Sequence, residues 1–291
     1  MRRHLVPALG PALCLALLTA ACGDDDQQAS TGDDSSTTTS SLAPIEPGDD
    51  PADGGTDGTD PAEDGLVITL DSHGGFVPVE VDAGNTAELV LLGDGRLISG
   101  APTIAIYPGP ALPAFQVSTV EAGDIADIVA AIEALDPDAD YSQNTVADAP
   151  DTTVTLRDGD RSIAITGNAL GMVDDTGPRA ELQAVVERLQ SLATGNGEQP
   201  YEPTALRIHD ITPLVGDAPE PVEGEPQGTV RAWPIPHDGA VCTVLTDAAQ
   251  VAKVLEVVRQ ATQLDRYATD AGERRLVVAP VLPGDPGCPD S

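Results

Sequence analysis

The stretch Leu89-Val90-Leu91-Leu92-Gly93-Asp94-Gly95-Arg96-Leu97-Ile98 predicts a β-hairpin. Asp-Gly between two apolar runs is a strong short-range hairpin signal. A second hairpin is predicted where residues 152–156 and 162–166 flank Asp158-Gly159-Asp160. Further strands are expected from β-rich runs over residues 66–70, 76–81, 103–106, 204–209, 240–245 and 275–281.

Three amphipathic helices are predicted from apolar residues that recur with helical spacing. The first follows a capping box of Ser118 and Glu121, and the second has Pro178 in its first turn. The third, capped by Thr246 or Asp247, ends near Val258. The expected fold class is therefore α+β, with mainly antiparallel sheets and about three helices packed on one face.

The chain divides by composition into a signal, a linker and a folded head. We predict a signal peptide over residues 1–22, a disordered acidic linker over 23–64, and α+β subdomains over 65–197 and 198–291. These two subdomains could equally be one continuous unit, because the length suits either arrangement.

The N-terminal segment ends at Cys22 after an apolar run from Leu5 to Leu18. Arg2 and Arg3 precede this run, as in a secretory signal. Its ending, Leu18-Thr19-Ala20-Ala21-Cys22, resembles the lipobox of bacterial lipoproteins. That resemblance implies diacylation of Cys22 and anchoring on the outer, extracytoplasmic face of the plasma membrane. A transmembrane anchor is the alternative, but the run is shorter than the roughly 18 residues that span a bilayer.

The linker, residues 23–64, carries 13 acidic residues and no Lys or Arg. Such a segment buries too little apolar surface to offset the chain entropy lost on folding. We interpret it as a self-repelling spacer. A cation-binding tail is the alternative, because Asp24-Asp25-Asp26 is a carboxylate run.

The head, residues 65–291, holds 35 of the 48 acidic residues and 12 of the 14 basic ones. This charge argues against binding to nucleic acid or direct adhesion to anionic lipid. Two cysteines remain in the head, Cys242 and Cys288. Outside the cytoplasm such a pair predicts a disulfide, with two separate thiols as the alternative.

Motifs for catalysis or metal binding are missing from the sequence. His237-Asp238 could form a catalytic pair, but a Gly follows directly and favours a turn. Asp136-Pro137-Asp138-Ala139-Asp140 begins like a calcium loop, yet Tyr141 stands where such a loop needs Gly. No His or Cys spacing fits zinc. We therefore predict a non-enzyme without a metal or cofactor.

Gly74-Gly75-Phe76 is the strongest candidate for a binding site. A glycine pair in a strand pattern indicates a bulge or a close backbone approach. This arrangement fits either a partner docking at Gly74, Gly75 and Phe76 or a plain strand corner.

Four motifs carry a resemblance to a family of uncharacterised actinobacterial lipoproteins over most of residues 65–291. They are Gly74-Gly75-Phe76-Val77-Pro78, Gly93-Asp94-Gly95-Arg96, Asp148-Ala149-Pro150 and Val281-Leu282-Pro283. Residues 66–192 are more distantly similar to emfourin, an inhibitor of thermolysin-type metalloproteases, in the order of strand, Gly-Gly-Phe, helix, hairpin and helix.

The expected function is that of a non-catalytic envelope lipoprotein that binds a protein or peptide. The emfourin resemblance implies, as an alternative, an inhibitor of secreted metalloproteases. A lipoprotein that binds a small molecule is a further alternative.

Overall fold

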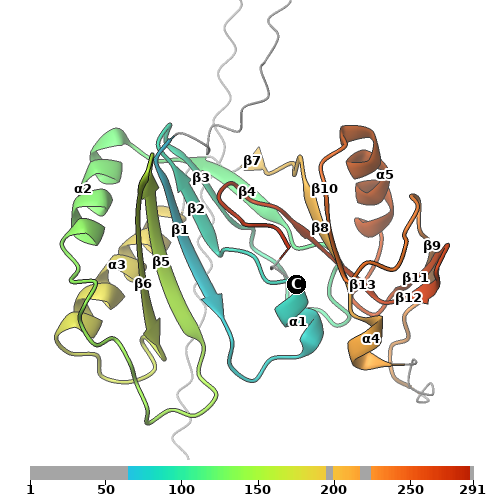
Figure 1. Ribbon diagram of the computed structural model, residues 1–291, viewed down its shortest axis with the longest axis horizontal. Helices are drawn as coiled ribbons and strands as arrows, with labels where there is room; N and C mark the ends of the chain where they lie inside the picture. The colour runs from blue at the N-terminus through green and yellow to red at the C-terminus, as the bar shows by residue number, and fades with distance from the viewer. Residues whose placement is uncertain (1–64, 195–198, 217–223, 289–291) are drawn as a thin grey trace, which may run out of the picture. The chain divides into compact units, whose positions relative to one another are not determined.

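A central antiparallel sheet of seven strands organises the first part of the head. The computed structural model describes residues 65–194, 199–216 and 224–288, all within one compact unit of the chain (Figure 1). The strand order is β6-β5-β1-β2-β3-β4-β7. These strands are β1 Val67–His73, β2 Leu89–Leu92, β3 Arg96–Gly100, β4 Phe115–Thr119, β5 Asp151–Asp158, β6 Arg161–Asn168 and β7 Gln199–Pro200.

Two helices cover one face of this sheet. They are α2 (Ala122–Glu133) and α3 (Pro178–Leu192), which lie side by side on the left of Figure 1. Ile128 and Ile132 of α2 and Leu182 of α3 are fully buried against the sheet core. The predicted apolar stripes of both helices are thus confirmed as core-facing.

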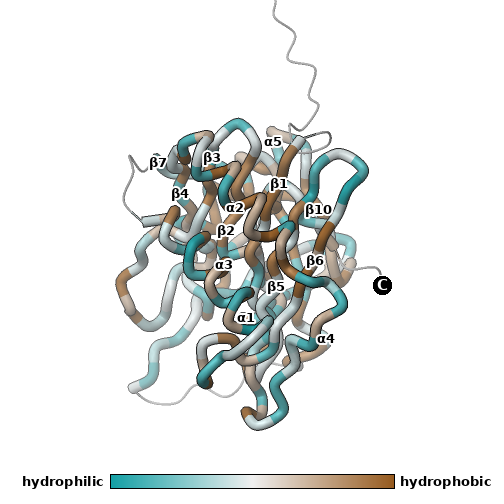
Figure 2. The backbone as a smooth tube through the Cα atoms, turned by 90° about the vertical axis from the view of Figure 1, so that its left-hand side faces the viewer, coloured by the Kyte–Doolittle hydropathy of each residue, from teal (hydrophilic) through white to brown (hydrophobic). Residues whose placement is uncertain are grey.

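The opposite face of the sheet is also buried at its centre. All four residues of β2 are buried, with Leu91 facing the helices and Val90 packed in a separate cluster with Val67 and Leu282. A continuous apolar run is typical of a strand that is covered on both sides. The brown segments of Figure 2 show these hydrophobic stretches in the strands of the sheet.

The second part of the head builds a further core around α5 (Ala248–Val258). This helix packs on a sheet with the order β10-β8-β13, and a smaller sheet has the order β12-β11-β9. The β11 and β9 strands are parallel, while every other strand pair is antiparallel within the described residues. The remaining elements are α1 Val79–Ala83, β8 Leu206–Asp210, α4 Thr212–Val215, β9 Val230–Ala232, β10 Cys242–Leu245, β11 Arg266–Thr269, β12 Gly272–Arg274 and β13 Leu276–Pro280.

The segment after β13 crosses the second face of the seven-stranded sheet. Its Leu282 fills the apolar cluster there, and Cys288 forms the predicted disulfide with Cys242 of β10. The buried guanidinium of Arg207 donates to the carboxylate of Asp285 at 3.0 and 3.1 Å and to the backbone oxygen of Asn85. One side chain thus joins β8, this segment and the loop before β2.

Several expectations from the sequence are confirmed and others are wrong. Both hairpins form, and Asp247 caps α5 by accepting from the backbone N–H of Gln250. The fold is mainly antiparallel α+β, but the helices do not share one face, because α2 and α3 lie on the seven-stranded sheet and α5 on another.

Residues 76–81 do not form a strand, because Pro78 starts the short helix α1. Residues 103–106 form no regular element, and Ser118 lies inside β4 instead of capping α2. The predicted signal peptide and linker lie outside the described residues. No described helix has the length and hydrophobicity needed to cross a bilayer.

Asp265 joins two segments of the second part, residues 229–231 and 262–265, and makes a testable contribution to stability. Burial raises the pKa of this carboxyl, but hydrogen bonds from the backbone N–H of Thr229 (2.7 Å), from Arg231 and from the N–H of Thr262 outweigh it and lower the pKa to about 2. Against an ordinary value of 3.8, this difference corresponds to about 2 kcal/mol.

We expect this stabilisation to be complete above pH 3.8 and to disappear as the pH falls toward 2, because the folded carboxyl has the lower pKa. Urea unfolding at pH 7, 4, 3 and 2 should show that Asp265→Asn loses stability mainly at the higher pH values. Asp160→Asn in the β5–β6 turn controls for the loss of one charge. Parallel pH profiles for wild type and Asp265→Asn would contradict this assignment.

Candidate functional site

The loop that carries Phe76 is fixed at its base and open at its tip. Gly74 and Gly75 both have φ 77°, a left-handed conformation that favours glycine. A Cβ on Gly75 would lie 2.9 Å from the backbone oxygen of Asp148. The close backbone approach expected from the glycine pair is therefore present. Phe76, the next residue, is 94% exposed.

Polar contacts hold α1 in place and leave its apolar side chains uncovered. His209 Nδ1 lies 2.7 Å from the backbone oxygen of Ala83, and Arg275 donates to Glu80 at 2.6 Å. None of the residues of α1 is buried. Val77, the residue after Phe76, and Val81 of α1 are both exposed.

Other exposed apolar residues lie in loops at the same end of the sheet. The strands β1, β3 and β6 run in one direction, because each pair of neighbours between them is antiparallel. The loops that follow these strands therefore emerge together. Arg275 also connects α4 to α1, since its backbone N–H donates to Thr212 at 2.8 Å. The exposed residues in these segments, which we name the apolar end, are Phe76, Val77, Val81, Ile104, Ile106, Tyr107, Met172 and Leu214.

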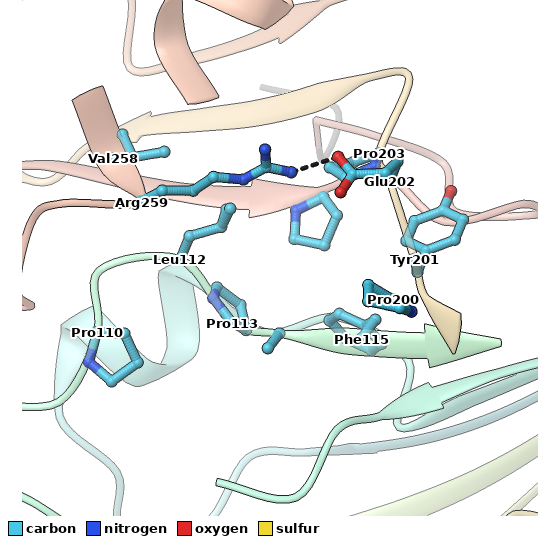
Figure 3. Close-up of a pocket in the computed structure, with 12 residues that line it drawn as sticks. Pro110, Leu112, Pro113, Phe115, Pro200, Tyr201, Glu202, Pro203, Val258 and Arg259 are labelled. Carbon is cyan, nitrogen blue, oxygen red and sulfur yellow. Dashed lines mark hydrogen bonds and ion pairs between the residues drawn. The ribbon is translucent and has the colours of Figure 1, made fainter. Parts of the chain in front are cut away.

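A shallow groove lies elsewhere on the head and is lined mainly by apolar side chains. Its volume is about 240 Å³, and an ion pair between Arg259 and Glu202 crosses its rim (Figure 3). The apolar lining residues are Pro110, Leu112, Pro113, Ala114, Phe115, Pro200, Tyr201, Pro203, Val258 and Pro280. Such a lining can contact aliphatic groups, and the one carboxylate among its residues, Glu202, is paired with Arg259.

His237 is buried and pairs with a carboxylate, although not with the one adjacent in sequence. Its Nε2 lies 3.4 Å from Asp210, whose other oxygen accepts from the backbone N–H of Thr212 at 3.0 Å. Asp238 instead accepts from the N–H of Ala240, as expected for a turn. Among the described residues, His237 makes no hydrogen bond to a hydroxyl or thiol, so this pair lacks a nucleophile.

The aspartates that resemble a calcium loop are used in local turns. Asp136 accepts from the backbone N–H of Asp138, and Asp140 accepts from that of Ser142. The hydroxyl of Tyr141 donates to the backbone oxygen of Asp136. In the described ranges no group of three His, Cys, Asp or Glu residues is placed to hold a metal ion.

The sequence identified only part of the apolar end. Gly74 and Gly75 form the base of its loop, and Phe76 lies at the exposed tip. Cys242 and Cys288 form the disulfide, whereas Cys22 lies outside the described residues. The residues after β3 were missed because Thr103–Ile106 alternates like a strand. The nearby prolines, Pro102 and Pro108, were the available signal for a loop.

Comparisons with known proteins yield no relatives. No family model, no curated protein and no solved structure matches the chain. The site must therefore be interpreted from its own geometry.

The two glycines of the loop allow a matched test of its rigidity. Gly74→Ala and Gly75→Ala impose the same left-handed strain, but only Gly75→Ala also brings a Cβ against the backbone of Asp148. We expect Gly74→Ala to lower the free energy of unfolding by about 1 kcal/mol and Gly75→Ala by about 2–3 kcal/mol, measured by urea denaturation. Equal losses would mean that the Asp148 backbone moves aside freely.

Proposed function

We propose that this protein is a non-catalytic envelope lipoprotein that binds a protein partner through its apolar end. The observation that carries this proposal is Phe76, which is 94% exposed on a loop whose base is fixed by a close backbone approach. Single exposed apolar residues are ordinary on a protein surface, but a group of them at one end is typical of an interaction site.

The charge of the head restricts the kind of partner. The head has 35 acidic and 12 basic residues, and Asp82 and Asp148 lie close in sequence or space to the apolar end. An anionic bilayer surface is repelled by such a head. We infer that the partner is a protein with an apolar pocket and basic residues around it, whose binding weakens as salt screens the attraction.

The anchor and the binding surface belong to opposite ends of the head. Residue 65, the first described residue, precedes β1, whereas Phe76 follows the other end of that strand. With Cys22 diacylated and residues 23–64 as a spacer, the linker joins the head away from the apolar end. This arrangement leaves the apolar end accessible to a partner in the envelope.

Fewer observations support the two alternatives to a protein-binding role, which are small-molecule binding and protease inhibition. A small-molecule site is less well supported, because three depressions on the described surface have volumes of only about 240, 260 and 240 Å³. Ligand pockets usually enclose about 300–1,000 Å³. Inhibition of a secreted metalloprotease remains a second candidate, because an exposed phenylalanine on a fixed loop can enter an apolar enzyme subsite.

Site-specific photo-crosslinking in native envelopes tests the binding surface directly. A photo-reactive amino acid at Val77 should give an adduct with one discrete protein, and the same amino acid at Asp160 in the β5–β6 turn should not. Phe76→Ala should reduce the Val77 adduct by roughly 30-fold, because truncating a central aromatic residue at an interface costs about 2 kcal/mol or more.

The identity of the adduct separates the alternatives. A metalloprotease whose activity the full chain lowers, and the Phe76→Ala chain does not, would favour the inhibitor. Adducts formed only with lipid, or equal yields from Val77 and Asp160, would refute a protein-binding apolar end.

Lipid anchoring is tested by Cys22→Ala. We expect the wild-type chain to incorporate labelled palmitate and to remain in the membrane fraction after a carbonate wash. The Cys22→Ala chain should incorporate no label and leave the membrane, because two acyl chains at one site provide stable anchoring. Retention of the unlabelled variant in washed membranes would instead indicate a transmembrane anchor.

A further inference from the structure

The middle of the edge strand β6 is unprotected against pairing with another strand. It forms one side of the seven-stranded sheet, and among the described residues its only partner is β5, over eight consecutive residues without a bulge (Figure 1). Natural sheets usually protect such an edge with proline, inward charges, bulges or a covering segment. Within β6 the only charged residue is Arg161, at its first position.

The hairpin register determines which backbone groups point away from β5. Asp158 and Arg161 flank the two-residue turn and form a hydrogen-bonded pair, so hydrogen-bonded and non-hydrogen-bonded pairs alternate from there. Thr153 and Thr166 form a non-hydrogen-bonded pair, and their hydroxyl oxygens lie 2.9 Å apart, as the closer side chains of such a pair allow. The N–H and C=O groups of Ser162, Ala164 and Thr166 therefore point outward.

Both ends of β6 are occupied, which limits the open part to these residues. At one end Arg161 forms an ion pair with Glu133 of α2. At the other end Arg179 donates to the backbone oxygens of Asn168 at 2.9 Å and Ala169 at 3.3 Å. Among the described residues no contact satisfies the outward groups of Ser162, Ala164 and Thr166, and all three residues are exposed.

The open part is nearly symmetric about its central residue. The sequence Ser162-Ile163-Ala164-Ile165-Thr166 places a hydroxyl residue, an isoleucine and then alanine in the same order from either direction. A two-fold axis requires this self-complementarity, because residue i of one copy meets residue j of the other and the reverse.

We propose that β6 pairs in antiparallel fashion with β6 of a second copy of this chain, around a two-fold axis through Ala164. Ala164 then faces Ala164 of the other copy, and Ser162 faces Thr166. These are the residues whose N–H and C=O groups point outward, so every open group in this part finds a partner.

The side chains in this pairing are compatible on both faces. Ile163, which is only partly buried at the helix-covered face, comes opposite Ile165 of the other copy, a favourable β-branched pair. Small side chains meet on the other face. Arg161 comes opposite Gly167, so like charges are not opposed across the axis. The product is a continuous sheet of fourteen strands, seven from each copy.

The salt dependence of this pairing is opposite to that of the proposed function. Two heads of the same negative charge repel each other, so added salt should strengthen the dimer. Binding of a basic partner at the apolar end should weaken with salt. The two proposals can therefore fail independently.

Cysteine crosslinking of the full-length chain in its own membranes tests the register. With an added oxidant, Ala164→Cys should give a disulfide-linked species of twice the monomer mass. Ser162→Cys is the matched control on the same strand and face. Its thiols would be about 14 Å apart in the dimer, because four residues of strand separate Ser162 from Thr166, and it should crosslink several-fold less.

Substitution at the same position separates dimerisation from folding. Ala164→Pro removes an outward N–H that β5 does not use, so the hairpin should persist while the dimer is lost. Ala164→Val keeps the N–H and should keep the dimer. Density-matched sedimentation of the detergent-solubilised full chain should give a dimer mass for wild type and Ala164→Val and a monomer mass for Ala164→Pro, with similar circular dichroism spectra.

A monomeric wild type at high salt, or equal crosslinking of Ala164→Cys and Ser162→Cys, would overturn the proposal. An Ala164→Cys adduct with a different protein would also overturn it, because the edge would then accept a foreign strand.

Discussion

The structure depends on a strand that is apolar on both of its sides. Since Leu89-Val90-Leu91-Leu92 is fully buried, the seven-stranded sheet needs a covering layer on each face. The helices α2 and α3 supply one layer. The other comes from the second part of the head, whose Leu282 packs onto Val90 and Val67. The two parts are therefore joined by the burial of apolar side chains. The hydrogen bonds from Arg207 to Asp285 and to the backbone oxygen of Asn85 connect them further.

The antiparallel order of the sheet explains why the apolar end exists. Because neighbouring strands alternate in direction, the segments that follow β1, β3 and β6 all start at the same end of the sheet. Turns of two or three residues occupy the other end between β2 and β3 and between β5 and β6. The exposed apolar residues of the longer loops lie outside the three buried clusters that form the core. This division links the topology to the proposed partner-binding role.

Local patterns in the sequence were informative where structure is decided locally. The turns at Gly93-Asp94-Gly95 and Asp158-Gly159-Asp160 and the helical stripes of α2, α3 and α5 all formed as predicted. Local patterns do not indicate which distant segment covers a strand or helix. The burial of β2 on both faces and the position of α5 on a separate sheet were therefore not predicted. The same limit applies to the site: the glycine pair indicated Phe76, but the meeting of loops after β1, β3 and β6 required the strand order.

The packing of Leu282 on the sheet has a consequence for how the chain is made. Leu282 follows Val67 by more than 200 residues in the sequence, yet both belong to one apolar cluster. During synthesis from the N-terminus, β1 and β2 emerge long before the segment that covers their second face. That face stays uncovered through most of elongation, which delays completion of the fold. The Cys242–Cys288 disulfide can close only after that delay, because Cys288 belongs to the same late segment as Leu282.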